Sequence, residues 1–207
     1  IEKRERAKTG KHLYEFTQLD FEIAYAKAKD VIKFVEDVIK RLFSYLRKSC
    51  KYELEYFGTY EKLKKIKFDE KDREELEKEF GKDWEEKIVK EIDYFLWVRN
   101  IPRQFYDYED FETGKWDNYD LLLPKIGEIL SGSKREIEYY KLVKKMERDR
   151  IKKEKYVLFL ELSKKGKLKP SAGAGIGLER LLAWICEVKH IAEVQPFPRI
   201  PGIVMDL

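Results

Sequence analysis

Three glycines alternate immediately before a predicted helix near the C-terminal end of the sequence, in the stretch SAGAGIG. Without side chains, Gly173, Gly175 and Gly177 let the backbone come close to a ligand, and the first turn of a helix offers free N–H groups to an anion. Glu179 and Arg180 follow in the helix, where a guanidinium can stack on a flat base or bind phosphate. Alone, the pattern also fits a glycine-rich strand end beside a surface ion pair, because it has neither the G-x-G-x-x-G spacing nor the lysine of common phosphate loops.

Apolar and polar side chains alternate over residues 13–25, which predicts a strand. The face expected to meet the core carries Leu19, Phe21, Ile23 and Tyr25. The opposite face carries Phe16, Gln18, Asp20 and Glu22. On this face an aromatic residue is followed by three polar or acidic ones, a pattern that suits the floor of a hydrated pocket.

Other segments have the periodicity of the helices and strands that would position these groups. An apolar stripe predicts a helix over residues 30–47, and the charged stretch 60–91 is expected to be helical with a break at Gly81. The remaining predicted elements are a strand at 94–98, a hairpin of 119–123 and 128–131, a helix from Lys134 to about Arg150, a strand at 156–162, and a final helix with a stripe of Leu178, Leu181, Leu182 and Ile185.

Length and charge set limits on the class of protein. The 207 residues are enough for one domain with a buried core, and we expect residues 1–207 to form a single domain. The 44 basic and 40 acidic residues leave a net charge of +4, too small to indicate a nucleic-acid-binding protein by itself. Four lysines could contact an RNA backbone, although a solvated face is the simpler interpretation: Lys144, Lys145, Lys152 and Lys153. Charged residues make up 41% of the chain, a density typical of hyperthermophile proteins.

The cysteines and the apolar runs indicate the compartment. Cys50 and Cys186 belong to no C-x-x-C pair, so we expect neither a disulfide scaffold nor a zinc site, and a reduced, cytoplasmic environment. No apolar run approaches the roughly 20 residues of a membrane helix, so no membrane partner is expected. Because the chain begins at Ile1 with a charged run, we expect that upstream sequence is missing.

Three segments in order resemble the motifs of class II aminoacyl-tRNA synthetases of the aspartyl/asparaginyl group. GAGIGLERLL followed by PFPRIPG is similar to motif 3 and its tail, and KHLYEFTQLDFEIAYA is similar to the loop and second strand of motif 2. YDLLLPKIGEILSGSKRE resembles the segment between them. The resemblance implies an α+β fold with an antiparallel sheet flanked by helices, a homodimer, and an enzyme that uses ATP and Mg²⁺ to form an aminoacyl-adenylate. Motif 1 and the start of motif 2 would then lie upstream.

The resemblance also implies roles for the residues of the ATP site. Phe16 would stack on adenine, with the guanidinium of Arg180 on the other side of the base. His12 would contact the γ-phosphate, and Gly177 would lie against the nucleotide. Each residue also has a simpler interpretation, Phe16 as core and His12 as a surface loop residue.

Metal and amino-acid ligands follow from the segment between the motifs. Glu128 and Ser131 would bind ATP-bound Mg²⁺ through oxygen, as magnesium prefers. Arg135 would pair with the side-chain carboxylate of aspartate through its two-pronged guanidinium. The other expected amino-acid contacts are Asp20, Glu22 and Gly175. Arg135, Arg180 and Glu128 are the expected catalytic residues, although Arg135 could be a helix-start ion pair and Glu128 a hairpin charge.

The sequence departs from the family pattern around the pocket. The motif 2 signature F-R-x-E is cut, so Glu2 is the preferred match to its acid and Glu5 the alternative. A serine, Ser171, stands where the family commonly has histidine, Ala174 replaces a usual aromatic, and Arg103 is only a loose match to a basic residue.

These departures suggest a paralogue, and three functions are compatible with them. The preferred hypothesis is an asparagine synthetase related to asparaginyl-tRNA synthetase, which forms aspartyl-adenylate and transfers the aspartyl group to ammonia. The alternative is a genuine asparaginyl- or aspartyl-tRNA synthetase, with aspartate or asparagine as the amino acid and tRNA as the acceptor. The third is a catalytically idle paralogue that acts as a binding module.

Overall fold

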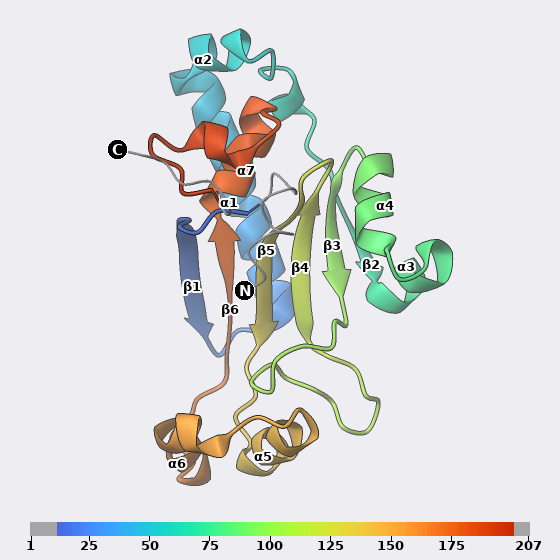
Figure 1. The fold of residues 1–207 in the computed structure, drawn as a ribbon, viewed down its shortest axis with the longest axis vertical. Coiled ribbons are helices and arrows are strands. Elements are labelled where there is room, and N and C mark those ends of the chain that lie inside the picture. Colours follow the sequence, from blue (N-terminus) through green and yellow to red (C-terminus); the bar gives the residue numbers. More distant parts are fainter. Residues whose placement is uncertain (1–11, 201–207) are drawn as a thin grey trace.

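Six strands form one sheet at the centre of the computed structural model, which describes residues 12–200 (Figure 1). The strand order is β1-β6-β5-β4-β3-β2, and each neighbouring pair is antiparallel except β2 and β3, which are parallel. The strands are β1 (Gln18–Ala24), β2 (Phe68–Asp72), β3 (Phe95–Arg99), β4 (Asn118–Leu123), β5 (Gly127–Lys134) and β6 (Ser171–Gly177). The sheet therefore brings β1, the first described strand, beside β6, the last one.

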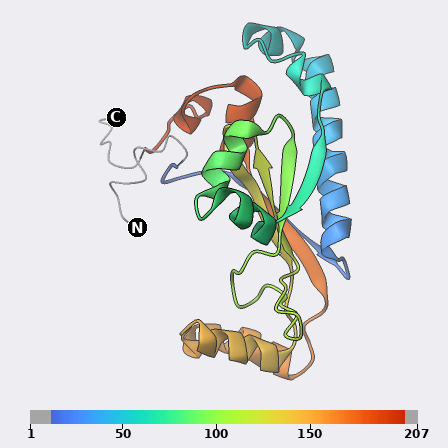
Figure 2. The same cartoon turned by 90° about the vertical axis from the view of Figure 1, so that its right-hand side faces the viewer.

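Helices lie on both faces and at both ends of this sheet (Figures 1 and 2). They are α1 (Ala28–Ser49), α2 (Lys51–Tyr56), α3 (Arg73–Phe80), α4 (Trp84–Glu91), α5 (Tyr139–Arg148), α6 (Val157–Lys164) and α7 (Leu178–Cys186). Short 3-10 turns are η2 (Lys62–Lys64), η3 (Lys153–Tyr156) and η4 (Ile191–Val194). None of the helices in the described range 12–200 is long and apolar enough to cross a membrane.

Helix α1 covers one face of the sheet because its apolar residues recur every four positions. Val31, Val35, Ile39 and Phe43 are buried, and the ring of Phe43 stacks on Trp184 of α7 with centroids 5.8 Å apart. Each such buried side chain stabilises the fold by about 1.5–3 kcal/mol relative to leaving it exposed. Figure 2 shows α1 along one side of the sheet. Phe21 of β1 packs on Phe34 of α1 with centroids 5.2 Å apart, so the alternate, polar residues of β1 face the other side.

Two of the further clusters extend the core toward α3 and α4 and into the lower helices. Leu76, Ile88 and Val89 of α3 and α4 pack on Leu96 and Leu122 of the sheet. At the lower end in Figure 1, α5, η3 and α6 form a helical lobe, defined here as residues 139–169. Its own small core consists of Phe105, Leu142, Met146 and Leu160.

The structure corrects two predicted elements of the lobe. Residues 156–162 are helical in η3 and α6, although the short apolar run YVLFLEL predicts a strand. Tyr156, Phe159, Leu160 and Ser163 follow helical spacing, and the first three pack against the lobe core while Ser163 is buried. The predicted helix from Lys134 instead begins at Tyr139, because the backbone of residues 134–136 stays extended through bonds to neighbouring segments.

Other predicted boundaries also change. The stretch 60–91 contains the strand β2, and its two following helices do separate at Gly81, where φ is +79°. The first strand begins at Gln18 rather than Leu13 and ends before Tyr25, which has a φ of +62°. In α7, Leu181 and Ile185 are buried as expected, but Leu182 is 42% exposed because it faces away from the core.

Candidate active site

The polar face of β1 lies against the glycines of β6. In the antiparallel register Gln18 pairs with Gly177, Asp20 with Gly175 and Glu22 with Gly173. A Cβ atom on Gly175 would overlap the side chains of Gln18 and Asp20, and one on Gly173 would overlap Glu22. The alternating glycines therefore make room for the three polar side chains of β1, which form the floor of an open cavity.

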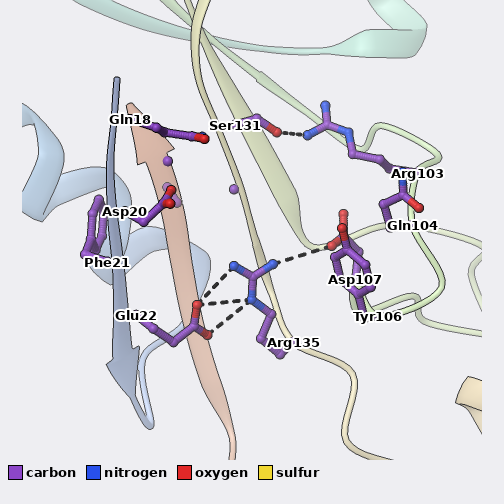
Figure 3. A pocket seen from close by; sticks show the side chains of 13 residues that line it. Gln18, Asp20, Phe21, Glu22, Arg103, Gln104, Tyr106, Asp107, Ser131 and Arg135 are labelled. Atoms are coloured by element: carbon purple, nitrogen blue, oxygen red, sulfur yellow. Dashed lines mark hydrogen bonds and ion pairs between the residues drawn. The ribbon is translucent and has the colours of Figure 1, made fainter. Parts of the chain in front are cut away.

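This larger cavity has a volume of about 530 Å³, the size of a small-molecule site (Figure 3). Its lining residues come from β1, β5, β6 and the loop after β3: Gln18, Asp20, Phe21, Glu22, Arg103, Gln104, Tyr106, Asp107, Ser131, Gly132, Arg135, Ala174 and Gly175. In Figure 3 the guanidinium of Arg135 lies between Glu22 and Asp107.

Arg135 is held by acids on two sides. Its Nη2 donates to Glu22 Oε2 at 3.0 Å, its Nε lies 3.2 Å from both Glu22 oxygens, and its Nη1 lies 3.7 Å from Asp107 Oδ1. Burial disfavours the charged guanidinium, but the bond to Glu22 and the charges of Glu22 and Asp107 outweigh it, so the pKa of Arg135 is raised. The guanidinium is thus fixed and charged, with Nη1 also donating to Ser133 Oγ at 2.8 Å.

A buried ion pair connects the helical lobe to this cavity. Lys145 of α5 lies 3.3 Å from Glu136, with both side chains 1% exposed, and its Nζ donates to the carbonyl oxygen of Asp107 at 2.5 Å. Asp107 in turn accepts a bond from Ser133 Oγ at 2.6 Å and flanks Arg135. Lys145 therefore fixes the loop beside Arg135, and the idea that it contacts an RNA backbone is wrong because the side chain is buried.

A smaller cavity of about 330 Å³ adjoins the first and shares Gln18, Ser131 and Gly175 with it. Its other lining residues are His12, Leu13, Phe16, Glu128, Ile129, Gly177, Glu179, Arg180 and Ile191. Phe16 is 64% exposed, so it is not a core residue. Arg180 Nη1 donates to the carbonyl oxygen of Glu128 at 2.5 Å, which brings motif 3 against the hairpin.

Glu179 of α7 connects the segment before β1 with the segment after η4 beside this cavity. Its carboxylate accepts bonds from the backbone N–H of Thr17 at 2.8 and 3.0 Å and from Gln195 Nε2 at 2.6 Å. The side chain is 5% exposed. This contact fixes the position of Phe16 relative to α7, so Glu179 has a positioning role that its acidic type alone did not indicate.

A β-bulge in the hairpin brings Glu128 and Ser131 to one face. Residues three apart on a regular strand point to opposite faces, but here Glu128 pairs with Leu122 while Ser131 pairs with Asp120, with the register shifting between Leu121 and Leu122. Glu128 and Ser131 consequently share the face of Asp120. This face lies opposite α1 and carries both cavities.

The cluster of Asp120, Glu128, Ser131 and Arg103 contains partly unsatisfied oxygen ligands. Arg103 donates to Ser131 Oγ and Asp120 Oδ2, whereas Asp120 Oδ1 is buried without a hydrogen-bond partner. Burial and the charge of Asp120 raise the pKa of Glu128 to about 7, against the opposing effect of Arg103 and Arg180. Burial likewise raises the pKa of Asp120. The ionised forms of Asp120 and Glu128 are thus disfavoured without a nearby cation. Together with the hydroxyl of Ser131, the two carboxylates form a set of oxygen donors that fits Mg²⁺.

The predicted site residues lie around the two cavities. Arg135, Asp20, Glu22 and Gly175 line the larger one, and Phe16, His12, Glu128, Ser131, Gly177 and Arg180 line the smaller one. Glu2 lies outside the described residues. Asp120 was not predicted from the sequence as a site residue, although a single acid within the apolar run YDLLLP could have indicated it. Arg103 was treated only as a loose match to a basic residue of the family. No group of three or more His, Cys, Asp or Glu side chains placed to hold a metal occurs within residues 12–200, so magnesium binding would also need the hydroxyl and the ligand's oxygens.

Comparison with known proteins identifies the family. A family model described as tRNA synthetases class II (D, K and N) matches residues 3–201. The chain belongs to this family. Among curated class II relatives, the asparagine–tRNA ligase of Mycoplasma mobile is 32% identical over 95% of this chain and 51% of its own length. That of Thermococcus kodakarensis is 30% identical over 96% of this chain and 51% of its own length.

The class II fold is confirmed by solved structures. Asparaginyl-tRNA synthetase from Pyrococcus horikoshii, in complex with asparaginyl-adenylate, superimposes with a TM-score of 0.85 and 28% identity. The match covers 98% of this chain and 51% of that protein. The chain thus spans about half the length of the class II relatives it matches. These relatives are tRNA ligases, which supports the tRNA synthetase alternative over the asparagine synthetase preferred from the sequence.

Proposed function

We propose that this chain carries the amino-acid-activating site of an asparaginyl-tRNA synthetase, which joins the carboxylate of asparagine to the α-phosphate of ATP. The observation that carries the proposal is the pair of adjoining cavities that share Gln18, Ser131 and Gly175. One cavity suits an amino acid and the other a nucleotide. The reacting atoms would meet at the shared residues, and holding two reactants together supplies much of the catalysis.

The smaller cavity has the parts of a nucleotide site. The exposed ring of Phe16 offers a stacking surface for adenine, and the planar guanidinium of Arg180 offers a second one. His12 also lines this cavity and would contact the phosphates, and Gly177 leaves the start of α7 accessible. These roles agree with those implied by the class II motifs.

Asp120, Glu128 and Ser131 are the residues that would hold Mg²⁺ with ATP. The cation would neutralise charge on the phosphates as the bond to the carboxylate forms. Binding would also stabilise the ionised form of Glu128, whose pKa is about 7 without it. Because Arg103 already bonds Asp120 and Ser131, it would have to release at least one of them.

The charge of the larger cavity favours asparagine over aspartate. Asp20, Glu22 and Asp107 contribute three negative charges to its wall, against two positive charges from Arg103 and Arg135. A second carboxylate, as in aspartate, would meet this negative excess, whereas an amide would not. The amide oxygen can accept from Arg135 and its N–H₂ can donate to Glu22, while Asp20 is suited to the substrate ammonium. The side-chain carboxylate inferred for Arg135 from the sequence is thus replaced by an amide in this proposal.

Transfer to tRNA is the second step of the proposed function, in line with the related ligases. The test is pyrophosphate exchange into ATP with the purified chain, supplied with asparagine or aspartate in separate reactions. We expect exchange with asparagine, and then charging of tRNA with it. Exchange with aspartate alone, or release of free asparagine from aspartate, ATP and ammonia, would refute the proposal in favour of an asparagine synthetase.

Two variants connect the exchange assay to the geometry. Arg135→Ala should abolish amino-acid-dependent exchange because it removes the donor to the side chain, with ATP binding retained. Glu22→Gln should reduce the preference for asparagine over aspartate, since it removes one negative charge from the cavity wall. Unchanged exchange in Arg135→Ala would rule out that residue as the side-chain ligand. A chain that binds no ATP at all would support the idle paralogue.

A further inference from the structure

The helical lobe carries a charge that differs from the rest of the chain. Residues 139–169 contain twelve lysines and arginines and four aspartates and glutamates, a net charge of +8. Because the whole chain has a net charge of +4, all other residues together carry −4. The near-neutral total therefore conceals a strongly basic lobe beside an acidic body, which is the charge pattern of a surface that binds a polyanion.

Much of this positive charge is not neutralised by ion pairs within the lobe. Three of the four acids are paired, with Glu147 to Lys153 at 2.6 Å, Asp149 to Arg148 at 2.8 Å and Glu161 to Lys165 at 3.6 Å. Four exposed lysines form no ion pair within 4.0 Å among the described residues: Lys152, Lys155, Lys167 and Lys169. Their side chains are available to an external partner.

The fold gathers these four lysines. Lys152 and Lys155 precede α6, and Lys167 and Lys169 follow it. Ile151 and Tyr156 on one segment and Leu168 on the other all pack against the same lobe core, so both segments converge there. Two tyrosines at the start of α5 are also exposed, Tyr139 to 38% and Tyr140 to 67%, and their rings lie under Lys164 and Lys144 respectively. Lysines can bind phosphates, and exposed tyrosines can stack on unpaired bases.

The lobe is also next to the larger cavity. The chain leaves the sheet for the lobe through Arg135 and returns through Ser171, whose Oγ donates to Glu22 Oε1 at 2.6 Å. Both crossings thus lie at the end of the cavity where the substrate side chain would bind. Figure 2 shows the lobe extending from the sheet on the side opposite α1. The polar residues of β1 face this same side, because Phe21 on the other face of the strand packs on Phe34 of α1.

We propose that the helical lobe is the RNA-contacting surface of this chain, which binds the phosphate backbone of the acceptor RNA through Lys152, Lys155, Lys167 and Lys169 as the 3′ end reaches the larger cavity. This inference deepens the proposed function and rests on it for the identity of the RNA. An RNA is favoured over a membrane surface because the chain enters and leaves the lobe at Arg135 and Ser171, beside the cavity from which an activated amino acid would be transferred.

The test compares two variants with equal loss of charge. The lobe variant is K152Q/K155Q/K167Q/K169Q, and the control is K29Q/K33Q/K48Q/K82Q, whose lysines are exposed on α1 and at the turn between α3 and α4. Binding of unfractionated transfer RNA is measured by filter retention over a range of NaCl concentrations. For the lobe variant we expect affinity to fall about tenfold or more and the slope of log K against log salt to become shallower by about 2 to 3.

Each outcome bears on the proposal separately from the adenylation site. Equal loss in both variants, or in neither, would overturn it, as would lobe-dependent binding to phosphatidylserine vesicles without binding to transfer RNA. Asparagine-dependent pyrophosphate exchange needs no RNA and should stay unchanged in the lobe variant. If exchange occurs but wild-type chain binds no transfer RNA, the lobe inference fails and the activation site stands. If RNA binds through the lobe but exchange is absent, the proposed function fails instead.

Discussion

The buried carboxylate of Glu128 should make this protein less stable as the pH rises. Its pKa is raised from 4.5 to about 7 in the fold, first by burial and then by the charge of Asp120. A carboxyl group with a raised pKa favours the folded state when protonated, and this advantage is lost as the pH rises from the unfolded value of 4.5 through about 7. At about 1.4 kcal/mol per pKa unit, the loss is about 3 kcal/mol in total.

Glu128→Gln removes the ionisable group while keeping its shape. We expect wild type and variant to have nearly equal free energies of unfolding at the acidic end of this range, and the variant to be more stable by about 3 kcal/mol above it. Guanidinium denaturation at several pH values, followed by fluorescence of the buried Trp97, Trp116 and Trp184, measures the difference. Glu112→Gln, at an exposed loop position, is the matched control and should leave the pH dependence unaltered.

One result would refute the reasoning. If Glu128→Gln and wild type lose stability in parallel across this pH range, the Glu128 carboxyl is not destabilised by burial and by Asp120. In that case the argument that a cation would relieve the pair also fails. If Glu128→Gln gains stability but no longer binds ATP with magnesium, the result would support the proposal that the destabilising carboxylate of Glu128 serves as a magnesium ligand.

Three further predictions test other parts of the site. Phe16→Ala should lower the free energy of unfolding by less than about 1 kcal/mol because the ring is exposed. It should nevertheless raise the KM for ATP about tenfold or more, because adenine loses its stacking partner. A KM for ATP similar to that of the wild type would show that Phe16 does not bind adenine. Gly175→Ala should abolish pyrophosphate exchange because its Cβ overlaps Gln18 and Asp20, whereas Gly177→Ala, whose Cβ would lie 3.7 Å from its nearest neighbour, should fold normally by circular dichroism. Lys145→Met should lose about 3–5 kcal/mol in denaturation by leaving Glu136 buried and unpaired, and Glu136→Gln in the same chain should restore part of it; no recovery would contradict the pairing.

Strong periodicity made much of the fold predictable from the sequence. The alternation through β1, the apolar stripe of α1 and the glycines before α7 each reflect a local rule that the tertiary structure obeys. The strand β2 escaped prediction because FDEKD, at the outer edge of the sheet, has little apolar character. The helix α6 escaped prediction because a short apolar run fits a strand and a helix equally well, and packing against the lobe core selects the helical arrangement.

Site residues could be predicted where they belong to a recognisable motif. They could not be predicted where their position depends on strand register or on an irregular loop. The motifs that they resemble predicted Phe16, Arg135 and Arg180 as ligand-binding residues, and each of the three lines one of the two cavities. Asp120 could not be predicted, because counting back from the hairpin turn pairs it with Leu130, and only the bulge shifts its partner to Ser131. Arg103 lies in an irregular loop, so no periodic pattern could place its guanidinium on that cluster.

The position of β1 at the edge of the sheet has a consequence for how ligand binding can be observed. Edge strands open more readily than central ones, and β1 is paired on one side only, by β6, among the described strands. Since β1 supplies Gln18, Asp20 and Glu22, local opening of this strand dismantles the cavity floor while the buried strands β3 and β4 remain folded. Amide hydrogen exchange in residues 18–24 should therefore be slowed by substrates far more than exchange in the centre of the sheet, so this strand acts as an internal reporter of occupancy.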